Sequence, residues 1–173
     1  RSEFQVNIQQ VAPAHWDDYV LGHPDGTPYH LAAAVEIGRR AFNLDVYYIF
    51  ATDTERRLCG VLPLVNQSSF VFGHFLSSVP FFNYGGVLAD APEVAAGLMR
   101  SAQDLARELR AKHFELRQKR VLEHACYPVR TDKVTLILDL PDTTEQLAKQ
   151  LGSKLRSQIK RAERENPKVE IGG

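Results

Sequence analysis

The sequence predicts an α/β (α+β) protein with a mixed, mainly antiparallel sheet flanked by helices. Two observations lead to this class. Apolar residues recur with strand and helix periods along the chain, in the order β-α-α-β-β-β-α-β-β-α-α-β. The 173 residues are 44% apolar and 24% charged and hold no repeats, which is the composition of an ordinary globular domain.

The amino-terminal part is expected to hold one strand and two helices. Residues 4–8 (FQVNI) alternate apolar and polar side chains, as a half-buried strand does. Residues 13–21 begin with Pro13 and carry early acidic residues, which is typical of a short helix. The turn cluster GHPDGTP precedes a second helix over residues 29–42. One face of that helix is expected to pack through Leu31, Val35 and Phe42.

A hairpin and a long helix follow. Residues 46–52 and 57–65 are two strand-like runs that flank the polar turn DTER. Residues 68–92 are rich in aromatic and β-branched residues and also predict strands. A helix is expected over residues 92–111, with Pro92 in its first turn. Its packing stripe is Leu98, Ala102, Leu105 and Leu109.

The carboxy-terminal part is expected to hold three strands and two helices. Strands are predicted over residues 113–117, 133–140 and 168–171. A helix over residues 143–151 is expected to be capped by Thr143 or Thr144. A second, basic helix follows Gly152-Ser153, and its packing face is predicted to be Leu151, Leu155, Ile159 and Ala162.

Charge divides the chain although its net charge is zero. Residues 1–100 carry 6 Lys and Arg against 10 Asp and Glu, whereas residues 101–173 carry 15 against 11. The basic second part suggests an anionic partner such as a phosphate or nucleic acid, and the alternative is a solvated basic face.

Several classes of protein are not indicated. No stretch is long and apolar enough to span a bilayer, although peripheral membrane association stays open. Cys59 and Cys126 stand far apart, which argues against a zinc site or disulfide framework and favours the reducing cytoplasm. The six histidines show no metal-ligand spacing, and no catalytic motif or residue is identified. Tyr29-His30, at a helix start, either faces a pocket or completes a turn.

The stretch NYGG is a candidate binding loop. Gly85 and Gly86 follow Tyr84 and precede the helix at Pro92. Adjacent glycines allow close backbone approach, and a helix N-terminus offers free N–H groups to an anion. In GNAT-type N-acyltransferases the cofactor pyrophosphate lies at the corresponding turn. The usual Gln/Arg-x-x-Gly-x-Gly/Ala pattern is absent, so a tight turn is the alternative.

Basic residues at strand ends form a second candidate. Arg117 ends one predicted strand and Arg130 precedes the next. Arginine binds phosphate or carboxylate in a bidentate way, and loops at strand ends often carry ligand-binding groups. The alternative is that they are loop charges, with Arg130 paired to Asp132.

The basic helix is the third candidate. Lys154 and Arg161 are two turns apart on one side, and Arg156 lies further round. Residues 149–168 carry 7 Lys and Arg against 2 Asp and Glu, and no carboxylate at i,i+4 neutralises Lys154 or Arg156. The helix is therefore either an anion-binding surface or a solvated face.

These segments resemble the FemAB family. The similarity runs from about Tyr29 to Gly173 and rests on VPFFNYGGVLAD, FELRQKR, YPVRTDKV, LILDLP and LGSKLRSQIKRAE. PFFNYGG and KLRSQIKRA are its most specific parts. More narrowly, the chain resembles FemAB-like proteins associated with bacterial exosortase (PEP-CTERM) and exopolysaccharide systems.

The resemblance implies two tandem GNAT-like folds in a chain about twice this length. Residues 1–150 are then expected to be the first GNAT-like domain, and residues 151–173 a basic helix and first strand leading into a second, absent domain. Better-known relatives transfer amino acids from aminoacyl-tRNA to a peptidoglycan precursor without metal or CoA. Substrate contacts carried over from the family fall on Lys154, Arg156 and Arg161.

Three functions follow as expectations. The first is an acyl- or aminoacyltransferase acting on a cell-envelope or exopolysaccharide precursor, with no resident cofactor and with aminoacyl-tRNA or acyl-CoA as donor. The second is a CoA-dependent GNAT N-acetyltransferase. The third is a non-catalytic module that binds a nucleotide-sugar or RNA through its basic face.

Overall fold

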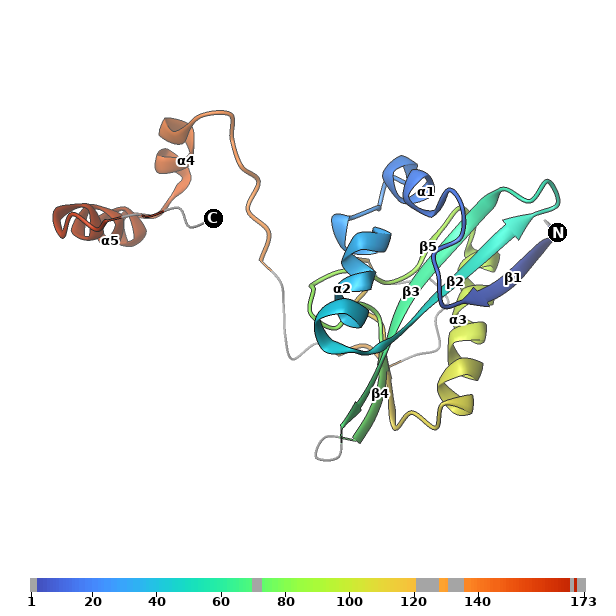
Figure 1. The fold of residues 1–173 in the computed structure, drawn as a ribbon. Coiled ribbons are helices and arrows are strands. Elements are labelled where there is room, and N and C mark those ends of the chain that lie inside the picture. Colours follow the sequence, from blue (N-terminus) through green and yellow to red (C-terminus); the bar gives the residue numbers. More distant parts are fainter. Residues whose placement is uncertain (1–2, 70–72, 121–127, 131–135, 169, 171–173) are drawn as a thin grey trace. The chain divides into compact units, whose positions relative to one another are not determined.

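The computed structural model describes residues 3–69, 73–120, 128–130, 136–168 and 170 (Figure 1). The chain divides into two compact units, residues 1–127 and residues 128–173. The predicted domain boundary at residue 150 falls within the second unit and stays a prediction.

The first unit is built on one mixed sheet. Its strands are β1 (Phe4–Gln9), β2 (Asp45–Asp53), β3 (Leu58–Ser69), β4 (Gly73–Ser77), the short β5 (Leu88–Ala89) and β6 (His113–Glu115). The order is β1-β2-β3-β4-β6, with β5 beside β3. All pairs are antiparallel except β4–β6, which is parallel. The predicted fold class is thereby confirmed.

Helices cover both faces of this sheet (Figure 1). α1 (Trp16–Gly22), a 3-10 helix (Pro28–His30) and α2 (Ala32–Phe42) lie on one face, and α3 (Pro92–Glu108) lies on the other. α3 follows β4 and precedes β6, so it is the crossover that makes this pair parallel. Pro92 stands in its first turn, as predicted.

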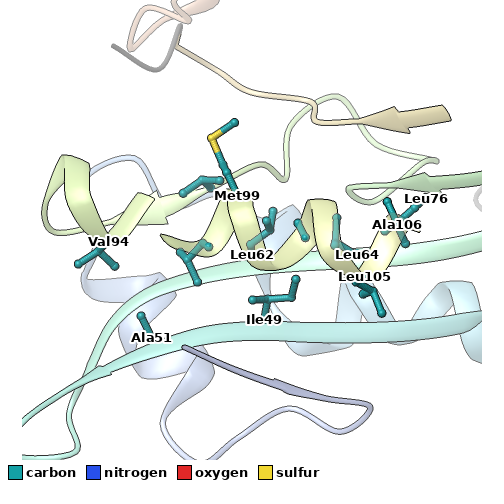
Figure 2. Close-up of a cluster of buried hydrophobic side chains, with 12 residues drawn as sticks. Ile49, Ala51, Leu62, Leu64, Leu76, Val94, Met99, Leu105 and Ala106 are labelled. Atoms are coloured by element: carbon teal, nitrogen blue, oxygen red, sulfur yellow. The ribbon is translucent and has the colours of Figure 1, made fainter. Parts of the chain in front are cut away.

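The larger core lies between α3 and the sheet. Figure 2 shows Val94 and Leu105 of α3 against Ile49 and Leu62 of the strands. Gly60 of β3 allows this approach, because a Cβ there would stand 2.7 Å from Val94 Cγ1. The predicted stripe of α3 is therefore confirmed for Leu98, Ala102 and Leu105, which are buried. Its fourth member, Leu109, lies just past the end of α3 and packs partly buried against the same core.

A second core lies under α1 and α2. Trp16 is fully buried and meets Tyr48 of β2 edge to face, with ring centroids 4.9 Å apart. Its indole Nε1 donates to the His30 carbonyl oxygen at 2.8 Å. This bond satisfies the buried indole and fixes the 3-10 helix against α1.

The second unit contains two helices, α4 (Thr144–Gln150) and α5 (Ser153–Arg164). Thr143 caps α4, because its Oγ1 accepts from the Gln146 amide at 3.2 Å. At the other end of α4, Arg156 Nη1 donates to the carbonyl oxygens of Leu151 at 2.6 Å and Ala148 at 3.2 Å. A guanidinium at carbonyls left over by a helix C-terminus is favourable, so Arg156 holds the corner between α4 and α5.

Two predicted strands are not seen. Residues 136–140 of the run 133–140 are irregular and exposed, and no strand in the described part of the chain pairs with them. Residues 133–135 lie outside the described residues. Lys168 and Glu170 lie in no strand, and the rest of 168–171, Val169 and Ile171, is likewise outside them. A strand is stable where a neighbouring strand pairs with its backbone groups, and the local sequence pattern does not show whether such a neighbour exists.

Three helix predictions need correction. α1 begins at Trp16 rather than Pro13, after His15 in a left-handed conformation. Phe42 is exposed and stacks on Phe81 instead of packing with Val35, because it stands at the last position of α2. The predicted packing face of α5 is not packed, and Leu155 and Ile159 remain 44% and 42% exposed.

No helix in the described part of the chain is long and apolar enough to cross a membrane.

Candidate functional site

Three segments far apart in the sequence meet in the first unit. They are residues 25–30, which form a turn and the 3-10 helix, the loop that leaves β4, and the residues that follow β6. His30 Nε2 lies 3.1 Å from the Gly86 carbonyl oxygen, and Gln118 binds Val87. An ion pair of 3.3 Å between Arg120 and Asp25 joins the third segment to the first. We call residues 78–87 the clamped loop.

After β4 ends, the clamped loop continues alongside β6 and the residues that follow β6. The Ser78 amide donates to Glu115 O at 3.0 Å, and Ser78 Oγ accepts from the Arg117 amide at 2.8 Å. Further along, the Gly85 amide donates to Arg117 O at 3.1 Å. The loop therefore extends the β4–β6 pairing, and the Gly85 amide is used inside the protein.

Both glycines of the loop are buried against the protein's own side chains. A Cβ on Gly85 would stand 1.9 Å from Val79 Cγ2, and one on Gly86 would stand 1.9 Å from Gln118 Oε1. Either substitution would force the side chain of Val79 or of Gln118 to shift. Close packing within the chain therefore favours glycine at both positions.

Gln118 binds Val87 as a neighbouring strand would. Its Oε1 accepts from the Val87 amide at 2.7 Å, and its Nε2 donates to the Val87 carbonyl at 2.9 Å. One side chain thus satisfies both backbone groups of a buried residue, which removes a desolvation cost of about 1–3 kcal/mol for each group.

His30 is held in one neutral form. The Gly86 carbonyl can only accept, so Nε2 carries the proton, and Nδ1 accepts from the Thr27 amide at 3.3 Å. The side chain is 3% exposed, and this burial lowers the pKa of His30 from its ordinary value to about 4. The imidazole is therefore a neutral bridge between the 3-10 helix and the clamped loop at pH 7.

Arg117 is the main charged group beside the clamped loop. Its Nε donates to Glu115 Oε1 at 3.0 Å, and Nη1 donates to the Phe82 carbonyl at 2.7 Å. The side chain is one-third exposed. These two bonds orient the guanidinium and leave further N–H donors on the same planar group for an anionic ligand.

Aromatic rings flank the loop. Tyr29 stacks on Phe82 at 5.0 Å between ring centroids, and Phe42 stacks on Phe81 at 4.3 Å. Phe42 and Phe81 are exposed, and Tyr84 is half-buried. The surface next to Arg117 is therefore partly apolar.

The structure brings some of the predicted site residues together. Tyr84, Gly85 and Gly86 lie in the clamped loop of the first unit, and Arg117 lies beside that loop. The other four predicted residues, Arg130, Lys154, Arg156 and Arg161, belong to the second unit and are exposed.

Within the second unit, the α5 cations have different surroundings. Arg156 is occupied with the α4 carbonyls, as described above. Lys154 and Arg161 form no ion pair with any carboxylate in the described ranges. Both side chains are exposed, so among the predicted site residues of α5 these two are accessible to an anion.

Sequence reasoning missed the two residues that hold the clamped loop. Gln118 stands between charged residues in a loop, and nothing in its neighbours indicates a buried role. For His30 the sequence predicts only that, with Tyr29, it faces a pocket or completes a turn. Its link to Gly86 joins residues 56 apart, for which one sequence carries no signal.

No metal site is found among the described side chains, where no group of three His, Cys, Asp or Glu gathers.

Comparisons with known proteins give one structural match. No family model matches the chain, and no curated protein matches it. A solved structure described as "Crystal structure of a probable acetyltransferase" matches with a TM-score of 0.44 and 16% identity. The match covers 80% of this chain and 99% of that one.

Replacing Gly86 tests the packing of the clamped loop. Because the new Cβ would collide with the Gln118 amide, Gly86→Ala is expected to lower the free energy of unfolding by about 1–3 kcal/mol in urea titrations. Gly22→Ala is the matched control, since no atom lies within 4 Å of the added Cβ, and should be neutral or slightly stabilising. Most of the Gly86→Ala cost should vanish in a Gln118→Ala background. An equal loss of unfolding free energy in both backgrounds would show that the effect of Gly86→Ala does not come from contact with Gln118.

The pH dependence of stability tests His30. The unfolded side chain titrates near 6.5 and the folded one near 4, so between these values the unfolded state binds more protons. The contribution of His30 is full above about pH 6.5 and is lost as the pH falls toward 4. Between pH 7 and pH 5, wild type should lose about 2 kcal/mol more than His30→Gln in urea titrations. Equal losses for wild type and His30→Gln between these two pH values would refute the assignment.

Proposed function

We propose that the chain is the N-terminal part of an acyl- or aminoacyltransferase of the FemAB/GNAT-like type. It acts on a cell-envelope or exopolysaccharide precursor. The observation that carries the proposal is the parallel pair β4–β6 around α3, with Arg117 oriented where the two strands end. The FemAB resemblance of the NYGG, FELRQKR and KLRSQIKRA segments supports the finer assignment.

The donor proposed is an activated ester, such as aminoacyl-tRNA, rather than acyl-CoA. Cradling a pyrophosphate takes free backbone amides. In the clamped loop the Gly85 amide is bound to Arg117 O and the Val87 amide to Gln118 Oε1. These contacts count against the CoA-dependent alternative at this loop.

The proposed reaction forms an amide from an ester. The acceptor amine attacks the ester carbonyl, the C–O bond of the ester breaks, the alcohol leaves with a proton, and the amine loses one. Positioning and electrostatic stabilisation can supply much of the acceleration. In this proposal the remaining Arg117 donors bind an anionic group of the substrate or the developing oxyanion, beside the apolar surface of Phe81.

The second unit supplies a cationic surface and, we propose, the lead-in to a second GNAT-like domain. Leu136, Ile137, Leu138 and Leu140 are each more than half exposed. Such contiguous apolar exposure usually marks an interaction surface. Docking of a further domain on residues 136–140 would remove it from water.

A second candidate is a non-catalytic module that binds RNA or a nucleotide-sugar. The cations Lys154 and Arg161 favour it, because neither is neutralised by a described carboxylate. Such binding alone would not require the orientation of Arg117, and for that reason we place it second.

Calorimetric titration of the full chain with aminoacyl-tRNA and, separately, with acetyl-CoA tests the proposal. We expect saturable binding of the tRNA that weakens at least about tenfold from 50 to 200 mM salt, and none of acetyl-CoA. Lys154→Gln with Arg161→Gln should weaken tRNA binding by roughly tenfold. Arg40→Gln with Arg100→Gln, which removes two exposed cations of the first unit, is the matched control.

Three outcomes distinguish the candidates. Micromolar binding of acetyl-CoA would move the assignment to the CoA-dependent enzyme. Equal binding of aminoacylated and deacylated tRNA, without transfer to an amine acceptor, would favour the RNA-binding module. Equal losses in the α5 variant and in its control would reject α5 as the binding surface.

A further inference from the structure

α5 combines an exposed apolar face with a high positive charge. Its twelve residues carry five cations and one acid, Glu163. Leu155 and Ile159 are one turn apart and stay 44% and 42% exposed, and the helix has no buried residue. A globular helix normally buries its apolar face, so this face is available for a partner.

The charges lie around the apolar face in a definite arrangement. At ~100° per residue, the acidic Glu163 and Arg156 lie beside the Leu155–Ile159 face, roughly 60° and 80° from its centre. Lys154 and Lys160 lie further round, about 120° from that centre on the two opposite flanks. Arg161 and Arg164 lie on the far side of the helix. Arg156 also binds the carbonyl groups at the end of α4, and these bonds fix the orientation of α5 relative to α4.

We propose that α5 docks on an anionic phospholipid surface. A helix with a short apolar face and a polar face rich in Lys and Arg is the pattern of helices that lie in the membrane interface. Leu155 and Ile159 enter the boundary between headgroups and acyl chains, and Lys154 and Lys160, on the two flanks, contact lipid phosphates. Lys and Arg stems can extend along the apolar face while their charges reach the headgroups.

The apolar face of α5 fits lipid, whereas the tRNA contact of the proposed function uses only cations of the helix. Phosphate contacts of RNA need the cations but not Leu155 and Ile159, and α5 has no aromatic side chain on which a base could stack. It also fits an anionic surface better than a neutral one, because no described carboxylate forms an ion pair with an α5 cation. The inference goes beyond the proposed function and stands on the helix alone.

Co-sedimentation of the full chain with phospholipid vesicles tests the proposal. We expect binding to vesicles of phosphatidylcholine with about one-third phosphatidylglycerol, and at least tenfold weaker binding to phosphatidylcholine alone. Leu155→Gln with Ile159→Gln should weaken binding to the anionic vesicles by about tenfold or more. Lys154→Gln with Lys160→Gln, which removes the two flanking cations, should do the same.

Matched controls separate α5 from general surface effects. Val11→Gln with Leu21→Gln removes two exposed apolar side chains from the first unit, and Arg40→Gln with Arg100→Gln removes two exposed cations there. Both should bind as wild type does. All these positions are exposed, and circular dichroism should give the same spectrum for every variant.

Two results would overturn the proposal. One is the absence of wild-type binding to anionic vesicles. The other is unchanged binding of the Leu155→Gln/Ile159→Gln variant, which would mean that charge alone acts and would favour a polyanion such as RNA. Vesicle binding is measured without donor or acceptor, so its failure is distinct from a failure of the proposed transferase activity.

Discussion

The paired hydrogen bonds between Gln118 and Val87 are the contact on which the candidate site depends. They join the loop leaving β4 to the residues leaving β6, at 2.7 and 2.9 Å. His30, in the 3-10 helix, forms a hydrogen bond with the carbonyl of Gly86, the residue before Val87. Because Val87 and Gly86 are buried, losing either contact would leave polar backbone groups without water or partner. The position of Arg117 follows from this arrangement, since its guanidinium is bound to the same loop.

The two units differ in how fully they bury their apolar side chains. The first encloses Trp16 on one face of its sheet and Leu98 on the other. In the second, residues 136–140 and the Leu155–Ile159 face stay exposed. The second unit also contains a strongly cationic helix, because α5 carries five cations against one acid. The first unit is therefore suited to hold a fixed site, and the second to meet another surface.

Local sequence patterns predicted most of the fold and little of the site. Alternation and helical spacing identified the β2–β3 hairpin, the stripe of α3 and the Thr143 cap, since each depends on neighbours in sequence. Residues 136–140 failed as a strand because pairing depends on a partner that the pattern does not contain. Arg117 could be selected by its charge at a strand end. Gln118 could not, because its role is set by the backbone of a residue 31 positions away.

Amide hydrogen exchange at Gly85 and Val87, followed by NMR, tests the central claim most directly. The account predicts that both amides exchange within about tenfold of the rate of Leu62 in the central strand β3, with and without saturating acetyl-CoA. It predicts that Gln118→Ala accelerates Val87 strongly and Leu62 little. Exchange of both amides at the rate of an unstructured peptide, or protection that arises only when acetyl-CoA is added, would contradict it.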